Sequence, residues 1–292
     1  MSARILAGLL ASTVLAAVPL VSGGGPGAES RLRLAVLPCT NIESTFRKFH
    51  PLLAYLKSAT GLSVSLAVPA DLADFESTTA NGQLDFALQD PHTYRQLSRL
   101  FDDASLLQTR ALDGTTRQSA VVVVRRDSGV LELAQLRGKT VMFGPRTSSP
   151  KWVAARLLFE GRGITVDRDL KAVNGGCCED IAFAVSLEAA DAGVICDHFL
   201  GQHGTRQKDL GVDPASLRVI GRTTAFPTRI FAARKGVPAA VVEAITQALI
   251  RLDAANPEQA GWMASAEIRG FLRTTPAEYL RELDRAAPPA RP

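Results

Sequence analysis

Strands and helices alternate along the first part of the chain. Residues 31–37 alternate between apolar and polar side chains and stop at Pro38, which is typical of a strand. The helical spacing of apolar residues that follows ends at Gly61. The expected strands are residues 31–37, 63–68 and 84–88, and the expected helices between them are residues 46–56 and 71–80. Because strands joined through helices pair in parallel, this order predicts an α/β sheet whose ligands gather at the C-terminal ends of its strands.

The same alternation continues to the end of the chain. Further strands are expected at residues 119–124, 140–143, 170–173, 192–196 and 218–222, and further helices at residues 131–139, 152–159, 181–189, 239–252, 257–266 and 276–285. A chain of 292 residues can bury two medium-sized cores. We therefore expect two lobes, with residues 30–118 and 224–286 in lobe 1, residues 119–223 in lobe 2, and a frayed tail at residues 287–292.

The N-terminal residues 1–25 predict an export signal. Arg4 gives a positive start, residues 5–21 are nearly all apolar, and small residues follow. An uncleaved single-span anchor is the alternative, which the short apolar run disfavours. We expect a mature protein in the periplasm. Its net charge of +4, with Lys and Arg scattered along the chain, disfavours a nucleic-acid partner and agrees with a small anionic ligand.

Residues 141–152 contain the strongest candidate for a binding site. An apolar strand runs into Thr147, Ser148 and Ser149, where a helix is expected to begin. The first backbone N–H groups of a helix are unpaired and lie at the positive end of its dipole, and hydroxyl side chains add further donors. The segment therefore predicts an anion site. The alternative is that Thr147 or Ser148 serves only as the N-cap.

Four stretches of the chain together resemble a known family. They are residues 46–56 before Gly61, residues 81–87 leading to Tyr94, residues 127–129 with 133–139, and residues 143–149. Over residues 33–252 they are similar to the phosphate-, phosphite- and phosphonate-binding periplasmic solute-binding proteins of ABC transporters. The resemblance implies a type II periplasmic-binding-protein-like fold, with two α/β lobes around a ligand cleft that closes about a two-segment hinge.

The resemblance also implies roles for particular residues. Thr147, Ser148 and Ser149 would donate hydrogen bonds to a phosphoryl-type oxyanion, and Tyr94 would face it from lobe 1. For Tyr94 the alternative is an aromatic side chain of the core. Pro150 stands where the family often has Gly, and Pro is acceptable in a first helical turn.

The cysteines leave several interpretations open. Cys39 and Thr40 follow the first strand, and Cys177, Cys178 and Glu179 stand where the family's phosphonate binders often have a His–Asp or similar polar pair. In an exported protein, Cys196 could bridge to Cys177 or Cys178. Alternatively, two or three thiolates could bind arsenite or another thiophilic species. Glu179 could hold a ligand amine or only complement the helix dipole.

These observations predict a binding protein and not an enzyme. No motif fixes a histidine beside a cysteine, so a thiol enzyme is the less favoured alternative, and no zinc pattern or cofactor motif is present. We expect a monomeric receptor that delivers a small oxyanion to the membrane permease of an ABC importer. The alternative is a cysteine-dependent arsenite sensor that signals to a membrane histidine kinase.

Overall fold

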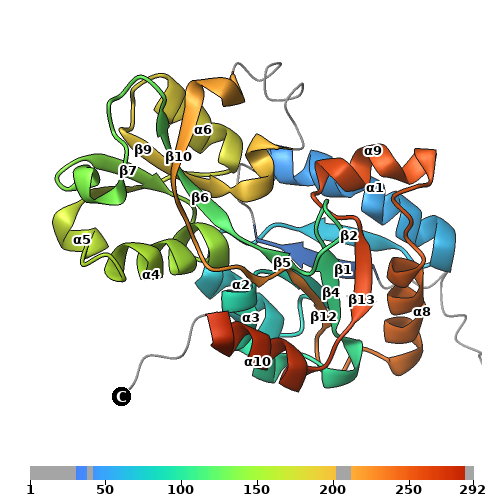
Figure 1. Cartoon of the computed structure of the whole chain (residues 1–292). Coiled ribbons are helices and arrows are strands. Elements are labelled where there is room, and N and C mark those ends of the chain that lie inside the picture. The colour runs from blue at the N-terminus through green and yellow to red at the C-terminus, as the bar shows by residue number, and fades with distance from the viewer. Residues whose placement is uncertain (1–30, 38–41, 202–211, 287–292) are drawn as a thin grey trace, which may run out of the picture. The chain divides into compact units, whose positions relative to one another are not determined.

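A computed structural model gives the fold of residues 31–37, 42–201 and 212–286 (Figure 1). The predicted export signal, Cys39, Thr40 and the predicted tail lie outside these described residues. The described helices and strands form two lobes, each built around its own sheet, which confirms the predicted two-lobe α/β fold. None of the helices in the described ranges is both long and apolar enough to span a membrane.

The larger lobe is built on a six-stranded sheet with the order β13-β4-β12-β3-β1-β2. Its strands are β1 (Leu32–Val36), β2 (Val64–Ala67), β3 (Phe86–Gln89), β4 (Leu107–Arg110), β12 (Ile230–Ala233) and β13 (Gly270–Arg273). β1 pairs in parallel with β2 and β3, as the alternation of strands and helices predicts. β12, β4 and β13 pair antiparallel, so the larger sheet is mixed.

Helices cover both faces of this larger sheet. They are α1 (Ile42–Thr60), α2 (Leu72–Ala80), α3 (Pro91–Leu97), α8 (Ala239–Ile250), α9 (Pro257–Ser265) and α10 (Pro276–Ala286). Alternate residues of β3 face opposite sides of the sheet. Phe86 and Leu88 pack with α1 and α8, whereas Ala87 packs with Phe75 of α2 and Tyr279 of α10. The end of β3 and the start of α3 thus lie on a rigid support.

The smaller lobe is built on a five-stranded sheet with the order β10-β6-β9-β7-β8 (Figure 1). Its strands are β6 (Ala120–Arg125), β7 (Thr140–Phe143), β8 (Lys171–Asn174), β9 (Ala192–Cys196) and β10 (Leu217–Arg222). Its helices are a π-helix at Ser149–Ala154, α4 (Ala155–Glu160), α5 (Val166–Asp169) and α6 (Cys178–Ser186). β7 pairs in parallel with β8 and β9, whereas β6 and β10 are antiparallel.

Two short strands pair where the chain passes between the two sheets. β5 (Arg117–Gln118) and β11 (Phe226–Pro227) form an antiparallel pair. The remaining short elements are 3-10 helices at Ser98–Leu100, Asp103–Ser105, Leu133–Leu136, Asp197–Leu200 and Pro214–Ser216. The predicted lobe boundaries fall beside the β5–β11 pair, and both the boundaries and a hinge motion stay predictions.

Three strands of the larger sheet were not predicted from the sequence: β4, β12 and β13. All four residues of β12 are buried, so the segment lacks the apolar–polar alternation that marks a half-exposed strand. The helix expected to begin at residues 147–149 and to continue over residues 152–159 does begin at Ser149, but its first six residues are π-helical. In contrast, α6 begins at Cys178 and not at Ile181.

Candidate functional site

The predicted anion site lies at the start of the π-helix. Ser148 is the N-cap, and its hydroxyl accepts a hydrogen bond from the backbone N–H of Lys151 at 3.3 Å. Ser149 is fully buried, Ser148 is 8% exposed, and Thr147 is partly exposed in the preceding turn. Ser148 is therefore the N-cap of this helix, and its role in ligand binding stays a prediction. The donors of Ser149 are directed elsewhere.

Ser149 binds a carboxylate of the larger lobe. The Asp90 carboxylate accepts hydrogen bonds from the backbone N–H of Ser149 at 2.9 Å and from the Ser149 hydroxyl. Asp90 is also the N-cap of α3, and its carboxylate accepts from the backbone N–H of His92 at 3.1 Å. The same N–H group donates to the Ser149 hydroxyl at 3.0 Å. An anionic group of the protein thus occupies donors that the sequence assigned to a ligand.

Tyr94 lies close by on α3 but belongs to the core. It is fully buried, and its ring meets Tyr279 edge-on with centroids 5.7 Å apart. Burial, followed by the negative charge of Asp103, raises the pKa of Tyr94, so the phenol is neutral at neutral pH. Its hydroxyl has no hydrogen-bond partner among the described residues, and neither do the side chains of Gln89 and Thr93. A role for Tyr94 in ligand binding stays a prediction.

Cys177 lies at the start of α6, in the smaller lobe. It is the N-cap of α6, and its backbone N–H donates to the Asp180 carboxylate at 3.1 Å. Asp180 therefore completes a capping box, and Glu179, in the same turn, complements the helix dipole. The Cys177 side chain lies toward the larger lobe, with its sulfur 4.0 Å from the Lys48 ammonium nitrogen.

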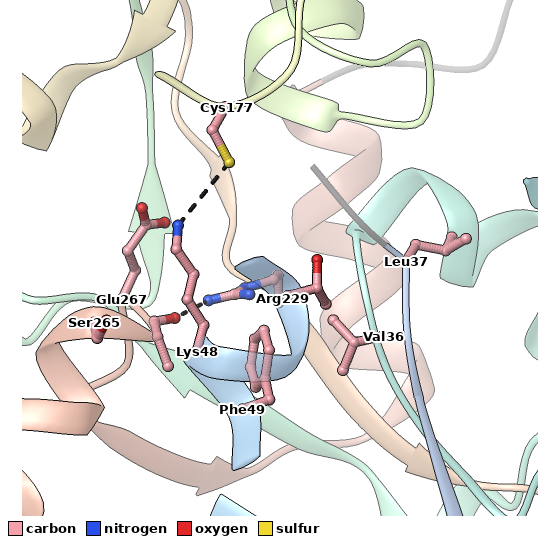
Figure 2. A pocket seen from close by; sticks show the side chains of 10 residues that line it. Val36, Leu37, Lys48, Phe49, Cys177, Arg229, Ser265 and Glu267 are labelled. Atoms are coloured by element: carbon pink, nitrogen blue, oxygen red, sulfur yellow. Dashed lines mark hydrogen bonds between the residues drawn. The ribbon is translucent and has the colours of Figure 1, made fainter. Parts of the chain in front are cut away.

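Figure 2 shows a cavity into which Cys177 and Lys48 point from opposite sides. The cavity is lined by Val36, Leu37, Thr45, Lys48, Phe49, Cys177, Arg229, Ser265, Ala266 and Glu267. Lys48 and Arg229 bring two positive charges and Glu267 one negative charge. Arg229 is fixed by a hydrogen bond of 2.6 Å to the carbonyl of Ala266. The cavity can therefore receive an anionic group beside a polar or cationic one.

Sequence reasoning identified only Cys177 among the residues that line this cavity. Lys48 lies on the amphipathic helix α1, Arg229 precedes β12, and Glu267 follows α9. None of the three belongs to a motif, and they are more than 30 residues apart along the chain. Only the packing of these elements brings their charges together, so no pattern in the sequence could have marked them.

His198 and Glu267 form an ion pair between elements of the two lobes. Their side-chain atoms Nε2 and Oε2 are 3.8 Å apart, and the His198 Nδ1 lies 2.9 Å from the Gln118 amide nitrogen. Burial alone would lower the pKa of His198, but the hydrogen bond and charge of Glu267 outweigh burial and raise it. Burial would raise the pKa of Glu267, but His198 lowers it well below its ordinary range.

We expect His198→Gln to lower stability more in mildly acidic solution than in alkaline solution. The pKa of His198 is higher in the folded state than the value of about 6.5 in the unfolded state. Its protonation therefore stabilises the folded protein fully below the unfolded pKa, and this contribution is lost as the pH rises through the folded pKa. The lowered Glu267 pKa adds stability above about pH 4.3. Urea unfolding of wild type and His198→Gln at pH values from about 5 to 9 measures the difference. Exposed His50→Gln is the control, and a pH-independent difference for His198→Gln would contradict the prediction.

Cys178 and Cys196 are in contact inside the smaller lobe. Both are buried, and the backbone N–H of Cys196 donates to the Cys178 sulfur at 3.2 Å. A hydrogen bond between the two thiols lowers the pKa of Cys178 and raises that of Cys196. The three described cysteines are not joined by a disulfide. No group of three His, Cys, Asp or Glu side chains in the described ranges is placed to hold a metal ion.

We expect oxidation to join Cys178 to Cys196 and to leave Cys177 out of this bridge. With oxidised glutathione, the two thiols lose two protons and two electrons and form one disulfide, while glutathione disulfide becomes two thiols. Mass spectrometry of unreduced peptides should then find the Cys178–Cys196 link in wild type and in Cys177→Ser, but not in Cys178→Ser. A link between Cys177 and Cys196 in wild type would contradict this pairing.

Comparison with known proteins decides the family. A family model described as "ABC transporter, phosphonate, periplasmic substrate-binding protein" matches residues 34–279. The chain belongs to this family. The predicted resemblance is thereby confirmed, and so is the prediction that the chain is not an enzyme, because the family consists of periplasmic substrate-binding proteins.

Several solved structures have the same fold as this chain. A binding-protein component of an ABC phosphonate transporter from Pseudomonas aeruginosa aligns with a TM-score of 0.72 and 16% identity, over 86% of this chain and 83% of its own. A Prochlorococcus marinus protein solved with methylphosphonate aligns at 0.71 and 14% identity, over 87% and 97%. A Xanthomonas citri protein solved with ATP aligns at 0.67 and 20% identity, over 88% and 95%. At these identities the likeness shows the type II fold alone.

Proposed function

We propose that this protein captures a small tetrahedral oxyanion of the phosphate, phosphite or phosphonate type and delivers it to the permease of an ABC importer. Thr147, Ser148 and Ser149 supply hydrogen-bond donors from the smaller lobe, and the hydroxyl of Tyr94 faces the ligand from the larger lobe. We also assign Cys39, Thr40, Cys177, Cys178 and Glu179 to ligand binding. The protein acts as a monomer, exported by a cleaved signal over residues 1–25, and closes its lobes on the ligand.

The observation that carries this proposal is the contact between Ser149 and Asp90. The amide and hydroxyl of Ser149 already bind one carboxylate, so their geometry suits an oxyanion. The contact lies between the start of α3 in the larger lobe and the start of the π-helix in the smaller lobe. Ligands of two-lobe α/β proteins are held between segments of this kind, at the ends of strands.

The cationic side chains of the cavity give further support. Lys48 and Arg229 stand on the larger lobe and Cys177 on the smaller one, around the same hollow (Figure 2). A negative charge in this hollow would be stabilised by both cations. The family match and the net charge of +4 agree with an anionic ligand.

Titration calorimetry on the exported, processed protein tests the proposal. Phosphate, phosphite and methylphosphonate are injected with and without reductant, and at least one is expected to bind with micromolar or tighter affinity. Ser149→Ala should weaken that binding about 10- to 100-fold, since a charge-assisted hydrogen bond contributes about 1.5–3 kcal/mol. Ser186→Ala, on α6 with its hydroxyl bonded to the Ala182 carbonyl, is the matched control. Absence of binding for all three ligands would refute the proposal.

The contact between Cys178 and Cys196 supports a second candidate, a sensor of arsenite that signals to a membrane histidine kinase. Two adjacent thiols are suitable ligands for a thiophilic species. Arsenite is therefore included in the titration, in the presence of reductant. Heat for arsenite alone, lost in Cys178→Ser, would favour the sensor. Heat for a phosphorus ligand that survives this substitution would favour the importer.

A further inference from the structure

Asp90 occupies an unusual place for a receptor of anions. Its carboxylate accepts hydrogen bonds from both the amide and the hydroxyl of Ser149, the residue to which we assign ligand oxygens. It also caps α3 through the backbone N–H of His92. The starts of two helical segments, one from each lobe, therefore converge on a single negative side chain.

We propose that Asp90 is a specificity-determining residue that selects ligands by their charge. This inference rests on the proposed function and deepens it. A ligand oxygen that binds Ser149 either displaces the Asp90 carboxylate or lies beside it. In both cases the ligand meets a fixed negative charge, so the site favours singly charged tetrahedral ligands over doubly charged ones.

The histidine that follows Asp90 on α3 does not compensate its charge. Burial, followed by the charge of Arg95, lowers the pKa of His92, so the imidazole next to Asp90 is neutral at neutral pH. Burial, followed by the negative charge of Asp90, also raises the pKa of Tyr279, whose ring packs against Tyr94. The negative charge of Asp90 thus acts on groups next to the candidate donors, beside the two cations of the cavity.

The expected selectivity follows from Coulomb's law. Repulsion grows with the product of the two charges, so Asp90 opposes a dianion about twice as strongly as a monoanion at the same position. Neutralising Asp90 raises the association constant of a monoanion by a certain factor. It raises the association constant of a dianion by the square of that factor. A role for Asp90 as a helix cap alone would not produce this relation, because capping does not depend on the ligand.

Asp90→Asn tests the proposal with little change in shape. An asparagine still offers an oxygen that can accept from His92 and Ser149, and Asn is a good N-cap. The matched control is Asp71→Asn, which changes the N-cap of α2 in the same lobe, where Asp71 accepts from the N–H of Asp74 at 2.8 Å. Thermal unfolding checks that both variants are folded.

The probes are phosphite and hypophosphite, at a pH above the second pKa of phosphorous acid. The two ions are close in size, and phosphite carries two charges where hypophosphite carries one. In calorimetry, Asp90→Asn should bind phosphite about tenfold more tightly than wild type, and hypophosphite about threefold more tightly. Asp71→Asn should bind both ions as wild type does.

Three results would overturn the inference. If Asp90→Asn gained the same factor in affinity for the two ions, or no affinity for either, the Asp90 charge would not determine selectivity. Weaker binding of both ions by Asp90→Asn would assign Asp90 to a ligand-supporting role. Absence of heat for phosphite and hypophosphite with every variant, together with the failed titrations of phosphate and methylphosphonate, would instead refute the proposed function and the inference with it.

Discussion

Phe231→Ala is expected to lower the free energy of unfolding by about 3–5 kcal/mol, the range for removing a buried phenylalanine. Phe231 lies on β12, in the middle of the six-stranded sheet, and is 1% exposed. Its ring stacks on Phe86 with centroids 5.4 Å apart and meets Phe271 edge-on at 6.4 Å. Alanine would leave a cavity between three strands that the rigid sheet cannot close.

Urea unfolding followed by circular dichroism measures this loss, with Phe183→Ala as the control. Phe183 is 43% exposed on α6, so its removal should change the free energy of unfolding by no more than about 0.5 kcal/mol. Similar losses for the two variants would mean that the core of the larger lobe is not packed around Phe231. If the lobes unfold in separate steps, the transition of the larger lobe should carry the change.

Gly193→Ala should destabilise the protein by about 1–3 kcal/mol, toward the upper end of this range for overpacking. Gly193 lies in β9, where α6 packs directly on the strand. A Cβ atom at this position would lie 2.5 Å from the Ile181 Cγ2 and 2.9 Å from the Val185 Cγ2. Both contacts are far inside the normal separation of carbon atoms, and both side chains are fully buried. The helix must therefore move away from the sheet.

Gly261→Ala is the control for the glycine substitution. Gly261 lies inside α9, and a Cβ atom there would meet nothing within 4 Å. Because alanine is the better helix former, this variant should gain about 0.5–1 kcal/mol. The two substitutions are chemically identical and should change the thermal unfolding midpoint in opposite directions. A neutral Gly193→Ala would show that α6 can shift without loss of packing.

The proposed binding residues show how much local sequence patterns can predict. The hydroxyl-rich helix start at Thr147 to Ser149 was visible because strand, turn and helix signals are local, and the structure begins a helix there. In the sequence, an aspartate before a proline indicates only a helix N-cap, and Asp90 is the N-cap of α3. Its second role, as the partner of Ser149, depends on a residue 59 positions away.

The amino-acid sequence by itself determined the parallel cores of both sheets, most helices and the family, because these depend on local periodicity and on the order of short motifs. The tertiary structure alone decided which charges meet. It brought Lys48, Arg229 and Glu267 around one cavity and placed Tyr94 in the core. It also added the antiparallel strands β4, β12 and β13. Burial of all four residues hides β12 from periodicity. Contacts between distant segments arise only when the whole chain packs.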